Sequence, residues 1–199
     1  MNMWDERYST PGYAFGTEPN EFLAQTCQHI PRGRVLSLGE GEGRNAVHLA
    51  KQGHAVTAVD QSAIGLEKVR RLAAENGVTI DTIPTDLADF QIEPNSWDGI
   101  VSIFCHLPLA LRARIHGQIV AGLRPGGAYL LEAYTPRQLE FGTGGPRDLE
   151  LLVTLEDLRA ELDGLHLEYA VEIERDVTEG RYHTGRAAVA QVVAVKPQI

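Results

Sequence analysis

The chain has 199 residues, 43% of them hydrophobic and 23% charged, which is the composition of an ordinary globular protein with one full core. A formal net charge of -9 at pH 7 argues against DNA or RNA as a partner, because proteins that bind them usually carry a basic patch. No apolar run reaches the ~20 residues of a membrane span, and no secretory signal is visible. Cys27 and Cys105 form no metal or redox motif, so we expect a cytoplasmic protein without a structural metal.

Residues 1–17 combine aromatic side chains, Tyr8 and Tyr13 among them, with glycine-containing turns. Such a segment forms either a lid over a pocket or a tail that packs on the core, and we interpret it as a lid. A helix is expected next, from residue 18 to about residue 30. Thr17 is placed to cap this helix, and the proline at position 19 is favoured in a first helical turn.

The most informative segment is VLSLGEGEGRN at residues 35–45, where an apolar strand leads into a glycine turn and then a helix. Asp60 follows at the end of the next apolar run. This layout predicts a nucleoside-binding crevice at the carboxyl edge of a parallel sheet. A carboxylate at Asp60 can accept hydrogen bonds from both hydroxyls of a ribose.

Two features of the glycine turn argue against a dinucleotide ligand. Arg44 stands where the third glycine of the G-x-G-x-x-G fingerprint is expected. Glu40 and Glu42 place carboxylates where two phosphates would lie, and like charges repel strongly in a crevice of low dielectric. S-adenosylmethionine fits better, since it has a ribose, an ammonium and a sulfonium but no phosphate. The alternative is an ordinary strand–helix turn without a ligand.

Strand-like and helix-like segments alternate from residue 35, which predicts a parallel sheet with helices on both faces. The expected strands cover residues 35–38, 55–59, 78–83, 97–104 and 128–134. Expected helices cover 44–52 and 108–123, and Ser62 caps another between them. The densest basic cluster, KVRR at residues 68–71, is expected on the solvated face of that helix.

The pattern changes after residue 134. Residues 135–153 form a long, glycine-rich segment, which we interpret as a substrate loop because such segments usually cover a functional site. Thr154 and Asp157 resemble a capping box that opens a short helix. The strand-like runs 165–177 and 187–196 should pair as an antiparallel hairpin, joined by residues 178–186.

Five motifs in this order resemble those of the class I S-adenosylmethionine-dependent methyltransferases, and the resemblance covers nearly the whole chain. The motifs are LSLGEGEG at 36–43, VD at 59–60, TDL at 85–87, WDGIV at 97–101 and LRPGG at 123–127. The resemblance implies an α/β, Rossmann-like, doubly wound sheet of seven strands in the order 3-2-1-4-5-7-6, with strand 7 antiparallel. It implies a single methyltransferase domain over residues 1–199, with 1–17 as its lid and 135–153 as its substrate loop.

Further motifs are similar to those of the tellurite-resistance and thiopurine methyltransferase branch. These are WDERY at 4–8, GTEP at 16–19, GRN at 43–45, FCHLP at 104–108, GTGGP at 142–146 and GRYH at 180–183. Glu40 departs from this branch, where a small residue or a cysteine is common at its position.

The resemblance also implies S-adenosylmethionine as the cofactor. It assigns the glycine turn to the methionine portion, Asp60 to the ribose, and Asp86 with Leu87 to the adenine. Asp86 is alternatively a turn or cap residue. The full cofactor-binding set that we expect is Gly39, Glu40, Gly41, Asp60, Gln61, Asp86, Leu87 and Phe104.

His106 follows the fourth strand and is the expected catalytic residue, because it can accept a proton from the acceptor or orient it. Alternatively, it bonds a neighbouring backbone group. In-line transfer from a sulfonium depends mainly on the alignment of nucleophile, methyl and sulfur. The expected acceptor is a small molecule: a thiol, a thiopurine, or a selenium or tellurium oxyanion. The residues expected to bind it are Tyr8, Tyr13, Arg147, His183 and Arg186, of which the last three are alternatively solvated surface residues.

Two other functions stay open at this point. One is a nicotinamide-dependent oxidoreductase that uses the same crevice, and the other is a non-enzymatic Rossmann-like interaction domain. We expect a monomer or homodimer that binds neither nucleic acid nor membrane.

Overall fold

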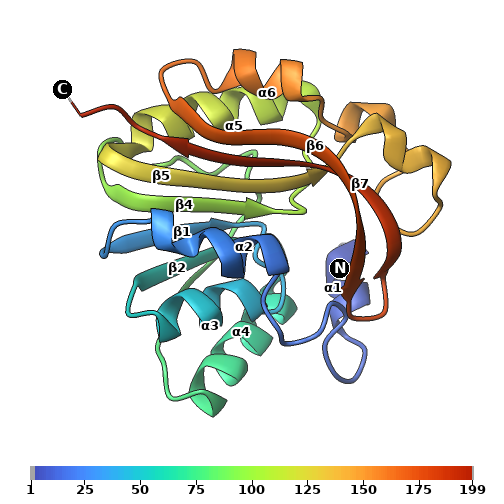
Figure 1. Ribbon diagram of the computed structural model, residues 1–199. Coiled ribbons are helices and arrows are strands. Elements are labelled where there is room, and N and C mark those ends of the chain that lie inside the picture. The colour runs from blue at the N-terminus through green and yellow to red at the C-terminus, as the bar shows by residue number, and fades with distance from the viewer. Residues whose placement is uncertain (1–2, 199) are drawn as a thin grey trace.

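The seven strands of the structure form one sheet in the order β3-β2-β1-β4-β5-β7-β6 (Figure 1). This computed structural model describes residues 3–198. β1 to β5 pair in parallel, whereas β7 is antiparallel to both β5 and β6. The α/β fold predicted from the sequence, with its strand order and its antiparallel seventh strand, is confirmed.

The strands are β1 (Arg34–Leu38), β2 (Ala55–Asp60), β3 (Asp81–Pro84), β4 (Trp97–Ile103), β5 (Leu123–Tyr134), β6 (His166–Glu179) and β7 (His183–Val195). The α-helices are α1 (Met3–Tyr8), α2 (Glu21–Thr26), α3 (Arg44–Lys51), α4 (Ala63–Glu75), α5 (Leu109–Gly122) and α6 (Leu155–Glu161). Short 3-10 helices cover Cys27–His29, Pro136–Glu140 and Leu149–Leu151. None of the helices within residues 3–198 is long and apolar enough to cross a membrane.

Helices cover both faces of the sheet, as the alternating pattern predicted (Figure 1). One hydrophobic core joins α2, α3 and α4 to the sheet, through residues such as Leu23, Leu49 and Val69. The other core joins α5 and α6 to the opposite face, through residues such as Ile119 and Leu158. The central strands are therefore buried on both sides, whereas β3 and β6 are mostly exposed or half-buried.

Several element boundaries differ from the sequence prediction. The helix expected from residue 18, which is α2, begins at Glu21, because the Asn20 side chain accepts the Leu23 amide and caps it in place of Thr17. β3 begins at Asp81, three residues later than expected. β5 begins at Leu123, so the LRPGG motif belongs to the strand. By contrast, the capping box that opens α6 is present as predicted.

The β6–β7 hairpin is longer than predicted, and its connection is confined to residues 180–182. It extends beyond the sheet, and its tip lies beside α1 (Figure 1). The Arg181 amide donates to the Ala14 carbonyl oxygen at 2.9 Å. The ring centroids of Phe15 and Tyr182 are 5.9 Å apart. The N-terminal segment and the hairpin tip therefore meet over the carboxyl ends of the strands.

Candidate active site

A cavity of about 490 Å³ opens at the carboxyl ends of β1, β2 and β4. Its walls come from the glycine turn after β1, the residues after β2 and β4, the N-terminal segment, the 135–153 segment and the hairpin tip. Ligands of open α/β sheets bind at this edge, and the volume is in the range of small-molecule sites. The cavity is therefore the candidate active site.

Asp60 ends β2 and braces the glycine turn. Its Oδ2 accepts the Gly41 amide at 2.8 Å and its Oδ1 accepts the Ser62 amide at 2.8 Å. Burial raises the pKa of Asp60, although these two amide bonds oppose the shift. Each carboxylate oxygen has a second lone pair, so Asp60 can shape the turn and still accept bonds from a ligand in the cavity.

Gly39 is required by close packing as well as by its backbone angle. Its φ is +61°, and a Cβ at this position would lie 2.6 Å from the Cys105 sulfur. Only glycine therefore fits at position 39, and Gly39 lines the cavity with its backbone.

Glu40 fills the N-terminus of α3. Its Oε1 accepts the amides of Asn45 at 3.2 Å and Ala46 at 3.0 Å, and its Oε2 accepts from the Ser37 hydroxyl. The N-cap residue of this helix, Gly43, has no side chain to supply such bonds. A dinucleotide phosphate would bind at this helix end, which already holds a carboxylate of the chain. The position of Glu40 therefore weighs against the nicotinamide alternative.

Glu42 turns toward the N-terminal segment. It accepts the Ala14 amide at 2.6 Å and the Lys68 ammonium at 2.7 Å. Lys68 also donates to the carbonyl oxygens of Thr10, at 3.0 Å, and Gly12, at 2.6 Å. The expectation that Lys68 is solvated was wrong, since these partners bury it to 9% exposure. The lysine instead ties the N-terminal segment to α4.

The predicted cofactor residues converge on this cavity with one exception. Gly41 does not line it, because the Tyr8 ring covers the glycine: a Cβ there would lie 2.7 Å from the Tyr8 oxygen. Asp86 reaches the cavity and also accepts the Ala88 amide at 2.8 Å, as a turn residue would. The residues that do line it are Gly39, Glu40, Asp60, Gln61, Asp86, Leu87 and Phe104.

The predicted acceptor residues are only partly brought together. Tyr8 and His183 line the cavity, and so does His106. The other three are placed elsewhere. Tyr13 faces the cations of Lys68 and Arg71, Arg147 is exposed, and Arg186 pairs with Glu174 at 3.0 Å. Because β7 already begins at His183, Arg186 lies within the strand and not in the hairpin turn.

An aromatic cluster on the inner side of the cavity was missed by sequence reasoning. Phe104 lies 4.6 Å from Tyr134 and 4.8 Å from His183, measured between ring centroids. Phe15 lies 4.5 Å from His183. Tyr134 could have been found from its place at the carboxyl end of β5, where the same edge rule applies.

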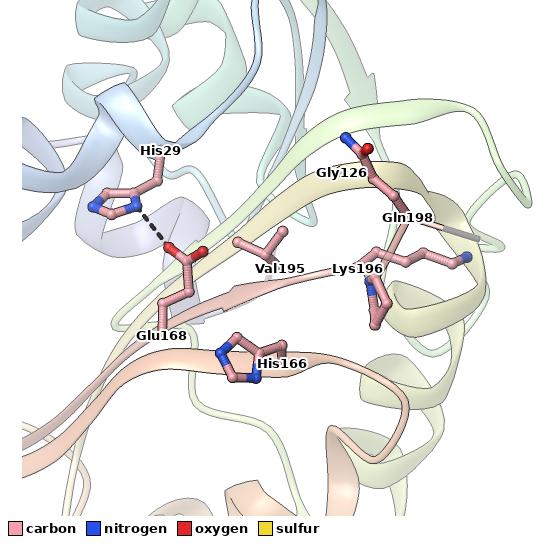
Figure 2. Close-up of a pocket in the computed structure, with 8 residues that line it drawn as sticks. His29, Gly126, His166, Glu168, Val195, Lys196 and Gln198 are labelled. Carbon is pink, nitrogen blue, oxygen red and sulfur yellow. Dashed lines mark hydrogen bonds and ion pairs between the residues drawn. The ribbon is translucent and has the colours of Figure 1, made fainter.

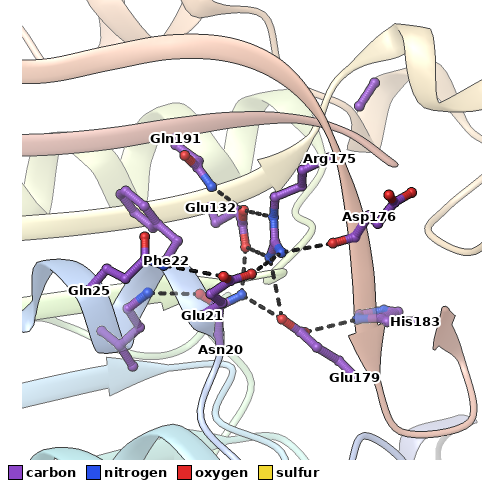
Figure 3. A network of polar contacts seen from close by, with 12 residues as sticks. Asn20, Glu21, Phe22, Gln25, Glu132, Arg175, Asp176, Glu179, His183 and Gln191 are labelled. Carbon is purple, nitrogen blue, oxygen red and sulfur yellow. Dashed lines mark hydrogen bonds and ion pairs between the residues drawn. The ribbon is translucent and has the colours of Figure 1, made fainter. Parts of the chain in front are cut away.

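A buried ionic network supports the cavity from behind (Figure 3). Glu132 on β5 is fully buried, and Arg175 pairs with both of its carboxylate oxygens, at 2.8 and 2.9 Å. Glu179 pairs with Arg44 at 2.6 Å. Burial opposes its ionisation, but the neighbouring His183 and Arg44 side chains outweigh burial and lower the pKa of Glu179 to about 2. Arg44 lines the cavity, and its Nη1 is buried without a hydrogen-bond partner among the described residues.

A second, more open hollow lies at the other end of the sheet (Figure 2). His29 and Glu168 face each other there at 3.0 Å, beside His166 and Lys196. Nowhere in residues 3–198 do three or more histidine, cysteine or acidic side chains gather closely enough to hold a metal ion. The chemistry-bearing groups are concentrated in the first cavity.

Residues 35–127 match the family model described as a methyltransferase domain. This region, a little under half of the chain, is similar to that family. The matched region runs from β1 through the LRPGG motif, and so includes the glycine turn, Asp60 and His106.

Individual proteins of known name are also similar to this chain. The chain is 27% identical over 139 residues to a 2-heptyl-1-hydroxyquinolin-4(1H)-one methyltransferase of Mycobacteroides abscessus, covering 68% of this chain and 61% of that protein. A crystal structure of TehB from Haemophilus influenzae has a TM-score of 0.72 and 20% identity, covering 97% of this chain and 65% of that one. A SAM-dependent methyltransferase structure from Methanosarcina mazei has a TM-score of 0.69 and 16% identity, covering 92% of this chain and 100% of that one.

These matches agree with the expected resemblance to S-adenosylmethionine-dependent methyltransferases. At such low identity the two crystal structures establish the fold alone. The narrower branch that the sequence resembles stays a prediction.

Glu40 should make cofactor binding depend on pH. Burial raises its pKa to about 7, so the carboxyl is mostly neutral below that pH and negative above it. A negative Glu40 attracts the sulfonium cation, and we expect S-adenosylmethionine to bind about fivefold more tightly at pH 8 than at pH 6, or ~1 kcal/mol. Calorimetry at both pH values measures this. S-adenosylhomocysteine, which lacks the sulfonium, should respond less, and Glu40→Gln should remove the difference. An equal pH response of the two ligands contradicts the prediction.

The segments 4–16 and 135–152 should close over the bound cofactor. Both supply cavity walls, and water-excluding covers of this kind order when a ligand binds. Hydrogen exchange of the protein with and without S-adenosylhomocysteine measures the closure. We expect slower exchange in both segments with the ligand, while β1 stays unchanged as an internal reference. Equal exchange of both segments in the two states contradicts a lid.

Proposed function

We propose that this protein transfers the methyl group of S-adenosylmethionine to a small-molecule acceptor. The observation that carries the proposal is the cavity at the carboxyl edge of the sheet, where Asp60 braces the glycine turn and Glu40 fills the end of α3. This site favours a cationic nucleoside over a ligand with phosphates. The chain spans less than two thirds of the length of its Mycobacteroides relative, so the activity of the whole protein is proposed here.

We assign the cofactor residues by the motifs that they share with the family. The glycine turn takes the methionine portion through Gly39 and Glu40, and Gly41, which is covered by Tyr8, supports the turn by its amide bond to Asp60. Asp60 accepts the ribose hydroxyls, and Asp86 with Leu87 contacts the adenine. Gln61 and Phe104 complete this side of the cavity.

The acceptor that we propose is a thiol, a thiopurine, or a selenium or tellurium oxyanion. The tellurite-resistance and thiopurine motifs support this choice, and the likeness to TehB is compatible with it. The Mycobacteroides relative is named for a small quinolone, which also favours a small acceptor. His106, His183 and Tyr8 line the acceptor side of the cavity. Such nucleophiles are reactive, so catalysis rests mainly on alignment.

A ligand titration followed by an acceptor panel tests the proposal. S-adenosylhomocysteine should bind the free protein, and NAD should not. Methyl transfer is then measured to thiols, thiopurines, selenite and tellurite, alongside RNA and protein extracts. We expect turnover with at least one small acceptor. Binding of NAD alone would support the oxidoreductase alternative, and transfer only to a macromolecule would overturn the proposed acceptor class.

A further inference from the structure

His106 is held in a fixed orientation on the acceptor side of the cavity. It follows β4, and its ring stacks on Tyr134 with a centroid distance of 5.4 Å and an interplanar angle of 12°. Its Nδ1 lies 3.2 Å from the carbonyl oxygen of Leu151, at the end of the 135–153 segment. Packing and this contact together fix which ring nitrogen faces which partner.

The Leu151 contact determines the tautomer of His106. A carbonyl oxygen can only accept a hydrogen bond, so the proton of a neutral ring must lie on Nδ1. Nε2 then carries a lone pair and acts as an acceptor. This atom is buried and has no hydrogen-bond partner within residues 3–198. A buried acceptor without a partner is costly, and because His106 lines the cavity, a donor group of a bound molecule would satisfy it.

We infer that the methyl acceptor enters as a nucleophile with a proton on its attacking atom, an S–H, O–H or N–H group, and that His106 Nε2 receives this proton. The inference rests on the proposed methyl transfer and narrows its substrate class. The attacking atom forms a bond to the methyl carbon, and the carbon–sulfur bond breaks with its electron pair left on sulfur. The bond between the attacking atom and hydrogen breaks as Nε2 takes the proton, which later passes to water.

The electrostatics of the site agree with this role. Burial, with the neighbouring His183 as a second cause, lowers the pKa of His106 to about 4. The ring is therefore neutral near pH 7 and ready to accept. A weak base is sufficient, because an atom that still carries its proton while it gains a methyl group becomes strongly acidic.

The same geometry discriminates between the proposed acceptor types. A selenium or tellurium oxyanion attacks through a lone pair on selenium or tellurium, and that atom has no proton for His106 to take. A thiol, or a thiopurine in its S–H tautomer, donates to Nε2 and delivers its proton there. The structure therefore favours the protonated nucleophiles over the oxyanions.

The test compares His106→Ala with the wild type in two measurements. Calorimetry with S-adenosylhomocysteine should give similar affinities for both proteins. Turnover with thiol and thiopurine acceptors should fall about 10²- to 10⁴-fold in kcat, with a small change in KM, and added imidazole should restore part of it. His166→Ala, on the exposed start of β6, is the matched control and should keep wild-type turnover.

The outcomes distinguish a failure of the proposed methyl transfer from a failure of the role assigned to His106. Wild-type protein that fails to bind S-adenosylhomocysteine overturns the proposed function, and this inference with it. Binding together with His106→Ala turnover within about threefold of wild type, or wild-type turnover with selenite or tellurite alone, overturns only the role of His106. Nitrogen-15 NMR of the wild type adds a readout that needs no acceptor: a proton on Nε2 at pH 7 also overturns it.

Discussion

Replacing Arg175 with leucine should lower the free energy of unfolding by about 3–5 kcal/mol. Glu132 is fully buried, and Arg175 pairs with both of its carboxylate oxygens. Asn20 and Gln191 also donate to Glu132, but neither supplies a positive charge. Without the guanidinium, a buried carboxylate would lack its counter-ion. Urea denaturation followed by circular dichroism measures the loss.

Arg186→Leu is the matched control on the neighbouring strand. Its guanidinium pairs with Glu174 at 3.0 Å, but the arginine side chain is 50% exposed, so we expect a loss below about 1 kcal/mol. Adding Glu132→Gln to the Arg175→Leu variant should recover part of the stability, because it removes the uncompensated charge. Similar losses of unfolding free energy in the two arginine variants would show that the buried ion pair stabilises the fold no more than the exposed one.

Asp60→Ala should weaken S-adenosylhomocysteine binding by about 1–3 kcal/mol, the range for lost hydrogen bonds to a charged group. Two contributions are expected. The variant loses the proposed bonds to the ribose, and it releases the Gly41 and Ser62 amides that now bond the carboxylate. Calorimetry measures the affinity, and circular dichroism establishes that the variant is folded.

Two further variants separate these contributions. Asp60→Asn keeps one acceptor oxygen for the turn and removes the charge, so its affinity should lie between those of wild type and Asp60→Ala. Asp81→Ala, on the exposed first residue of β3, should bind like the wild type. Unchanged affinity in folded Asp60→Ala would remove Asp60 from the cofactor site.

The sequence was sufficient for the sheet because each strand and helix shows its own periodicity, and because the motif resemblance supplies the strand order. Helix ends were harder to predict. Thr17 and Asn20 both have capping side chains, and the choice of Asn20 depends on its bonds to Glu132 and Glu179 from distant strands. Hairpin length depends on pairing partners, so the extension of β7 to His183 was not visible in the hydrophobic pattern.

Site residues that follow the end of a strand could be predicted from one general rule. Contacts that depend on tertiary packing could not. Asp60 and His106 were located because parallel strands end at a common edge, and the motif resemblance located Asp86. The stacking of His106 on Tyr134 joins a residue after β4 to the last residue of β5, and no local pattern reveals it. Likewise, the burial of Lys68 follows from carbonyl groups that only the folded N-terminal segment brings to it.

Glu40 has two roles in the glycine turn, and this has a consequence for redesign and for divergence among related proteins. Its carboxylate repels phosphates and also bonds the first amides of α3. A single exchange to glycine would free those amides for a pyrophosphate and, at the same time, leave the helix uncapped, at a cost of about 1 kcal/mol. A change of cofactor class at this turn therefore needs a second substitution that caps α3, which makes the present ligand preference difficult to lose in one step.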